Sequence, residues 1–139
     1  MQYLQITPGS IPHEPLSQSP FKAVLLSETM LDDEQRAAVS RWLVSSGCLY
    51  MMAWGEDCRA WQDAVNLINL QDYDFGSVPD DKLIISTSHP GENIEDVFWF
   101  AKYTALHPCA SLEQTLILQI TAANAAGRGE ELELMYAGT

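Results

Sequence analysis

Glu28, Glu56, Asp57 and His89 are the residues of this chain best placed to do chemistry. Each lies within a few positions of the end of an apolar run. A carboxylate beside an imidazole can act as general acid and base, or can hold a divalent metal. The same residue types are also ordinary at helix N-termini and in turns. We therefore name these four as candidate catalytic residues and keep a purely structural role open beside the catalytic one.

The elements that would position these candidates follow from an alternation of patterns. Four short apolar runs alternate with three segments of helical periodicity, and the runs are Phe21–Ser27, Cys48–Ala53, Leu83–Thr87 and Leu116–Ile120. Strands that alternate with helices are joined by crossovers, which favours a parallel sheet. We predict an α/β fold, a three-layer α/β/α sandwich of about four parallel strands in the order 2-1-3-4.

The helix starts show where a site would form. Thr29 or Asp32 is placed to cap the first helix, Asp57 the second and Asn93 the third. In an open parallel sheet, ligands bind beyond the carboxyl ends of the strands. If the protein binds a small ligand or is a hydrolase-type enzyme, the pocket should therefore hold the four candidates, with Trp54 in its wall.

Several chemistries lack their sequence signature. Neither glycine-rich phosphate-binding motif occurs, and the G-x-S-x-G element of serine hydrolases is missing. Cys48, Cys58 and Cys109 are odd in number and have no paired-ligand spacing, which argues against a disulfide framework and a zinc site. We expect no cofactor and no metal.

The charge balance limits the possible partners. The chain has 7 Lys and Arg residues against 19 Asp and Glu residues, a net charge of −12. This disfavours nucleic acids and anionic membranes and favours a basic protein. No apolar run approaches the roughly 20 residues of a membrane span, and Met1–Gln5 lacks the basic start of a signal peptide. We therefore expect a cytoplasmic protein.

Aromatic residues suggest a binding surface. Large aromatic rings are numerous in the second and third helical segments and in the turn before the second. One small helix–sheet contact should not be able to bury all of them. Aromatic side chains are enriched at interface hot spots, so Trp99, Tyr103 and Trp61 are candidates for contact with a partner or a second copy. We expect a non-enzymatic module that binds a basic protein, comparable in charge and size to immunity proteins and antitoxins.

The expected organisation has three parts. Residues 1–20 form an extended, proline-rich arm, residues 21–121 the α/β domain, and residues 122–139 a tail or edge element. Within the last part, Glu131–Tyr136 alternates acidic and apolar residues. That segment fits either an added edge strand or a short helix.

Three segments carry a family resemblance. Ser46–Gly55 (SGCLYMMAWG), Val97–Lys102 (VFWFAK) and Ala105–Pro108 (ALHP) hold several Trp, Cys and Met residues in fixed order. In these segments the chain resembles a family of small bacterial proteins known as a domain of unknown function. The resemblance covers about residues 21–121 and implies a bacterial origin. It brings no activity, cofactor or catalytic residue with it.

Overall fold

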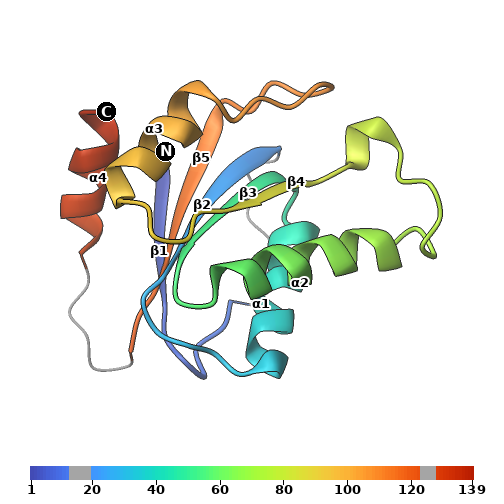
Figure 1. Ribbon diagram of the computed structural model, residues 1–139, viewed down its shortest axis with the longest axis horizontal. Helices are drawn as coiled ribbons and strands as arrows, with labels where there is room; N and C mark the ends of the chain where they lie inside the picture. Colours follow the sequence, from blue (N-terminus) through green and yellow to red (C-terminus); the bar gives the residue numbers. More distant parts are fainter. Residues whose placement is uncertain (13–19, 123–127) are drawn as a thin grey trace.

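The fold is taken from a computed structural model, which describes residues 1–12, 20–122 and 128–139. These residues form one sheet of five parallel strands, in the order β1-β5-β2-β3-β4 (Figure 1). The strands are β1 (Gln2–Ile6), β2 (Phe21–Ser27), β3 (Cys48–Gly55), β4 (Ile85–Ser88) and β5 (Gln114–Ile120). The predicted class, a parallel α/β fold, is confirmed.

Helices lie on both faces of this sheet (Figure 1). They are α1 (Asp33–Ser45), α2 (Cys58–Gln71), α3 (Ile94–Tyr103) and α4 (Gly129–Ala137), with a single 3-10 turn, η1 (Asp80–Lys82), before β4. Asp32 caps α1 by accepting a hydrogen bond from the backbone N–H of Gln35 at 2.8 Å. Asp57 and Asn93 occupy the cap positions of α2 and α3, but neither side chain makes a capping hydrogen bond.

β2 is buried along its whole length and separates two hydrophobic clusters. Ala23 and Leu25 point into the cluster under α1 and α2, whereas Val24 and Leu26 point into the cluster under α3 and α4. A strand covered on both faces needs apolar side chains on both, which explains its near-continuous apolar run. Each large side chain that is fully buried contributes about 1.5–3 kcal/mol to stability.

The predicted strand order is wrong. The order 2-1-3-4 places the third expected strand beside the first, but β4 lies at the edge beside β3, and β5 lies beside β2. Burial explains the difference. β5 is buried from Thr115 to Ile120, while β4 has only four half-buried residues. A strand with two apolar sides is most stable inside a sheet, and a short polar one is tolerated at the edge.

The N-terminal segment contributes a strand that we did not predict. Gln2–Ile6 forms β1 at the edge beside β5, with Leu4 opposite Leu118. Its prediction as an arm followed from the prolines that come after it. Pro8 and Pro12 lie beyond the strand, so they remove no hydrogen bond from it. Residues 13–19 of the expected arm lie outside the described residues.

The C-terminal segment is a helix, so the added edge strand is wrong. Leu132 and Tyr136 are four residues apart and both are buried, which is the spacing of one helix face. Tyr136 packs edge-to-face on Phe98 of α3, with 5.4 Å between ring centroids. Burial of this stripe against α3 stabilises the helix.

Gly55 ends β3 at a point where the neighbouring strand, β2, approaches too closely for a side chain. Its φ is +95°, and a Cβ there would lie 2.2 Å from the carbonyl oxygen of Ser27. The next residue, Glu56, donates its backbone N–H to that same oxygen at 2.8 Å. The turn into α2 therefore depends on glycine for two reasons, backbone conformation and space.

Replacing Gly55 by alanine should lower the free energy of unfolding by more than the usual cost of placing alanine in a left-handed backbone conformation. Gly9 is the control, because its φ is +81° and no atom lies within 4 Å of its would-be Cβ. We expect Gly9→Ala to cost about 1–2 kcal/mol, and Gly55→Ala clearly more because of the overlap with Ser27. Urea unfolding of the two variants measures the difference, and equal losses would contradict the steric argument.

Candidate functional site

The carboxyl ends of β2 and β3 enclose a hollow of about 390 Å³, where the sequence predicted a site. Its lining residues are Ser27, Glu28, Trp54, Gly55, Glu56 and Asp57. Three of the four candidate catalytic residues and the predicted wall residue Trp54 therefore come together. His89 is not among the lining residues, so the expected group of four does not form as one cluster.

Glu28 is held by a polar network that joins the sheet to α4. Its carboxylate accepts a hydrogen bond from the amide of Gln119 and pairs with Arg128 at 3.1 Å. Gln119 in turn accepts the hydroxyl of Tyr3, and burial raises the pKa of Tyr3. The Tyr3 ring lies against Gly129, where a Cβ would come within 2.6 Å of it. The network thus fixes the start of α4.

Asp57 pairs with a base on the neighbouring helix. The Arg36 guanidinium donates to the Asp57 carboxylate at 3.0 Å and also pairs with Asp33. Asp57 itself is left-handed, with φ of 60°. Its carboxylate ties the starts of α1 and α2 together. Glu56 is exposed beside it. Unlike Glu28 and Asp57, it pairs with no arginine among the described residues.

His89 is buried away from the hollow, in the turn between β4 and α3. One ring nitrogen, Nε2, lies 2.8 Å from the Thr87 hydroxyl, and the other, Nδ1, lies 2.9 Å from the Glu92 carboxylate. The ring packs edge-to-face on Phe100 at 4.9 Å. With 5% of its surface exposed, His89 holds the turn in shape.

Glu92 is the carboxylate that stands beside the imidazole, and the sequence did not single it out. It lies in a Pro-Gly turn, which made it look like an ordinary loop residue. Its backbone carbonyl accepts the indole N–H of Trp54 at 2.6 Å. The spacing of three residues from His89 was the available signal, but only the turn geometry brings the two side chains into contact.

The three partner-contact candidates separate into two groups. Trp61 is 1% exposed and donates its indole N–H to the Ser27 hydroxyl at 3.3 Å, so its assignment to a binding surface is wrong. Trp99 and Tyr103 are 56% and 55% exposed. Their rings are in contact at a tilt, with 5.4 Å between centroids and 48° between the ring planes. Their aromatic character grouped all three residues, and only the packing shows which of the rings turn inward.

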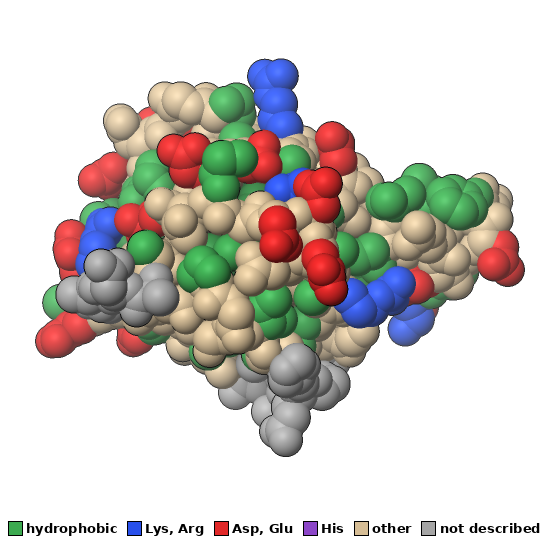
Figure 2. All heavy atoms as spheres, turned by 90° about the horizontal axis from the view of Figure 1, so that it is seen from below, with side chains coloured by type: hydrophobic (Ala, Val, Ile, Leu, Met, Phe, Trp, Pro, Cys, Tyr) green, Lys and Arg blue, Asp and Glu red, His purple; other side chains and the backbone are tan. Residues whose placement is uncertain are grey.

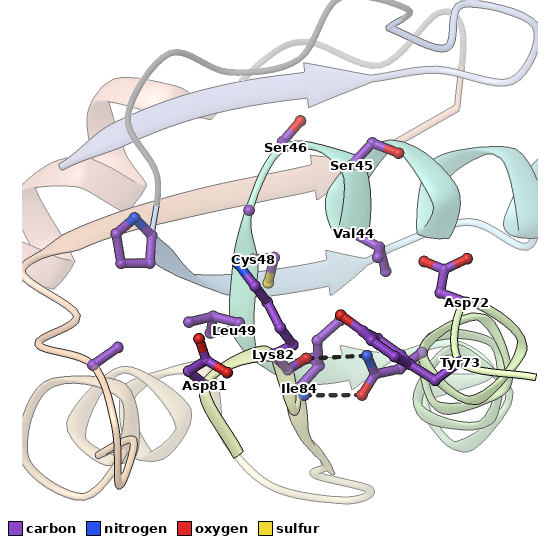
Figure 3. Close-up of a pocket in the computed structure, with 14 residues that line it drawn as sticks. Val44, Ser45, Ser46, Cys48, Leu49, Asp72, Tyr73, Asp81, Lys82 and Ile84 are labelled. Carbon is purple, nitrogen blue, oxygen red and sulfur yellow. Dashed lines mark hydrogen bonds between the residues drawn. The ribbon is translucent and has the colours of Figure 1, made fainter. Parts of the chain in front are cut away.

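A larger hollow, of about 540 Å³, lies at the opposite, amino edge of the sheet. It is enclosed by the end of α1, the start of β3, the end of α2 and the segment before β4 (Figure 3). Tyr73, Asp81 and Lys82 are among its lining residues. The sequence did not point here, because the general expectation for parallel sheets favours the carboxyl edge.

The described residues form neither a metal-binding cluster nor a membrane-spanning helix. Within the described part of the chain, no three His, Cys, Asp or Glu residues lie close enough together to hold a metal ion. None of the described helices is long and apolar enough to cross a membrane. All three cysteines are free, with Cys48 and Cys58 buried and Cys109 exposed.

Comparison with known proteins places the chain in a family. The sequence model of a family described as "Domain of unknown function (DUF7684)" matches residues 1–139. No curated protein and no solved structure matches the chain.

The cysteines should differ sharply in reactivity. Burial raises the pKa of Cys48 to about 12, so at pH 8 it is almost entirely the unreactive thiol. Cys58 is also buried, and Cys109 is exposed. We expect a disulfide reagent to modify Cys109 quickly in the native protein and the other two only on unfolding. The Cys109→Ser variant should lose the fast phase, and a fast phase that survives this change would contradict the assignment.

Proposed function

For this chain, which belongs to the DUF7684 family of unknown function, we propose a non-enzymatic role as an interaction module that binds a basic protein. The proposed contact surface is the exposed side of α3, formed by Glu95, Asp96, Trp99 and Tyr103, which we call the α3 face. The observation that carries the proposal is the exposed aromatic pair Trp99 and Tyr103, whose rings are in contact, with two carboxylates one helical turn away.

Helix geometry places these four side chains together. Glu95 and Asp96 precede Trp99 by four and three residues, and Tyr103 follows it by four. Residues three and four apart are neighbours on a helix surface. Both acids and both rings belong to exposed residues. An aromatic pair beside carboxylates is a suitable receptor for lysine and arginine, which can pair with the acids while stacking on the rings.

The distribution of charge supports a basic partner. Every described acidic residue is exposed, whereas several basic side chains are used inside the fold. Lys22 donates to the carbonyl of Ala101 at the end of α3, and burial lowers its pKa. Lys102 donates to the carbonyl of Tyr136 at 2.9 Å, near the end of α4. The outer surface is therefore more acidic than the composition alone suggests.

The acidic groups are spread widely over the surface. Figure 2 shows one face, on which acidic side chains lie scattered among apolar ones. Such a field attracts a basic partner over several ångströms and raises the association rate, and salt screens it. The rings of Trp99 and Tyr103 would then supply the desolvated contact that slows dissociation of the complex. The resemblance to immunity proteins and antitoxins extends to charge and size and no further.

Neutralising the acids of the α3 face should weaken capture of the partner. The test is capture from native lysate on the tagged protein, elution by a salt step and identification by mass spectrometry. We expect Glu95→Gln with Asp96→Asn to weaken binding about five- to tenfold, since each exposed pair contributes up to about 1 kcal/mol. The control, Asp74→Asn with Glu113→Gln, removes the same charge at other exposed positions and should change little.

Two results would overturn the proposal. If no basic protein is released by salt, there is no partner of the proposed kind. If both pairs of substitutions weaken capture equally, the protein attracts cations through its net charge and has no binding face on α3.

Truncating Trp99 should separate binding from folding. Because more than half of its surface is exposed, we expect Trp99→Ala to change the free energy of unfolding by less than about 1 kcal/mol and to reduce capture at least tenfold, as hot-spot residues do. Leu67→Ala, at another exposed apolar position on α2, is the control and should bind normally. Unfolding of the Trp99 variant would show that the ring belongs to the core.

A further inference from the structure

We propose that the hollow at the amino edge of the sheet binds a small zwitterion, an α-amino acid with an apolar side chain. This inference goes beyond the proposed function and does not depend on it. The hollow is enclosed by the ends of α1 and α2 and by the segment before β4, whereas the α3 face belongs to a helix that packs on the other hydrophobic cluster. Two sites on opposite faces can be tested separately.

The hollow has the size and walls of a ligand site. Its volume of about 540 Å³ falls in the range of roughly 300–1,000 Å³ that small-molecule pockets occupy. Val44, Leu49, Ile84 and the ring of Tyr73 supply apolar wall. In Figure 3 the Tyr73 side chain reaches from the end of α2 toward the middle of the hollow, with its hydroxyl at the inner end.

The backbone that carries the charged groups is fixed from two sides. The amide of Asn69 donates to the carbonyl of Lys82 at 3.1 Å and accepts the N–H of Ile84 at 3.0 Å (Figure 3). His107 bonds the carbonyl of Leu83 at 2.8 Å through Nε2, and its Nδ1 accepts the N–H of Cys109. Because Nδ1 accepts, Nε2 carries the proton and donates. Because this segment is already held in place, the protein loses less conformational entropy when a ligand binds.

Two opposite charges that line the hollow at exposed positions remain available. Arg41 neutralises Asp72 by donating to both carboxylate oxygens at 2.9 Å. Asp81 and Lys82 are different: within the described residues, neither side chain has an ion-pair or hydrogen-bond partner, and they do not pair with each other. Figure 3 shows the Lys82 side chain extended across the hollow toward the start of β3.

A zwitterion is the ligand that uses both charges. A simple carboxylate would pair with Lys82 and leave the carboxylate of Asp81 facing it, and a simple amine would have the reverse problem. An α-amino acid offers its carboxylate to Lys82 and its ammonium group to Asp81, and its apolar side chain can lie on Val44, Leu49 and the Tyr73 ring. The α1 end, where helix carbonyls are negative, also favours the ammonium group.

The test compares three matched compounds with the full chain. L-phenylalanine carries both charges, 3-phenylpropionate lacks the ammonium group, and phenethylamine lacks the carboxylate. Titration followed by calorimetry and by protein-observed NMR should show saturable binding of L-phenylalanine, with both analogues at least about tenfold weaker, since each loses one charged hydrogen-bonded contact. L-leucine should bind with an affinity similar to that of L-phenylalanine, because the apolar wall can contact any apolar side chain of suitable size.

Variants locate the binding. Asp81→Asn and Lys82→Met should each weaken L-phenylalanine binding about tenfold or more. Asp74→Asn and Arg59→Met are the controls, since they remove the same charges at exposed positions that do not line the hollow. Far-UV circular dichroism checks that all four variants are folded.

Each contrary outcome overturns the proposal. Absence of saturable binding by L-phenylalanine and L-leucine rules out an amino-acid site. An analogue that binds as tightly as L-phenylalanine shows that the hollow recognises a single charge. Binding that survives both Asp81→Asn and Lys82→Met places the ligand elsewhere. None of these results bears on the α3 face, whose test uses other residues and another readout.

Discussion

Burial of β2 on both faces is the constraint on which the rest of the structure depends. Every residue of this strand is buried, including Lys22. Its two sides must be covered by different helices, so α1 and α2 pack on one face and α3 and α4 on the other. Lys22 is the polar exception, and its ammonium group reaches the carbonyl of Ala101 at the end of α3. A charge inside the sheet is thus used to satisfy a helix terminus.

The carboxyl and amino edges of the sheet differ because different contacts hold the chain at each. At the carboxyl edge, Gly55 lets β3 turn directly over Ser27, and carboxylates there are bound by Arg36 and Arg128. These ion pairs hold the starts of α1, α2 and α4 in place. At the amino edge, α1 and α2 end without closing the space between them, and a hollow remains. Asp81 and Lys82, which have no ion-pair partner among the described residues, line this hollow, so the ligand site that we propose lies opposite to the usual end of a parallel sheet.

Net charge and its placement have separate consequences. A charge of −12 on 139 residues opposes compaction through self-repulsion. The fold reduces this cost by keeping acids at the surface, where water screens them, and by using Lys22 and Lys102 on helix ends. The acidic groups therefore lie on the surface of the described part of the chain. The exposed rings of Trp99 and Tyr103 are what distinguish the α3 face from the rest of that surface.

The sequence by itself determined the elements whose signals are local. The apolar runs at Phe21–Ser27 and Cys48–Ala53 are strands, Asp32 caps α1 as one of the two predicted cap residues, and the alternation of strand and helix indicated the parallel α/β class. These features rest on periodicity and on hydrogen bonds between near neighbours. The meeting of Glu28, Glu56 and Asp57 at one edge also followed, because parallel strands bring their carboxyl ends together.

The tertiary structure decided what depends on contacts between distant residues. The order of the strands and the formation of β1 and α4 depend on contacts with residues far along the chain. The hydrogen bond between Gln119 and Glu28, for example, joins residues 91 positions apart. His89 met Glu92 because the turn folds back, and Trp61 turned inward where Trp99 did not. Local spacing assigns a residue to a helix face, but only packing determines which face is covered. The amino-edge hollow is likewise a space between separate elements, and no single segment encodes it.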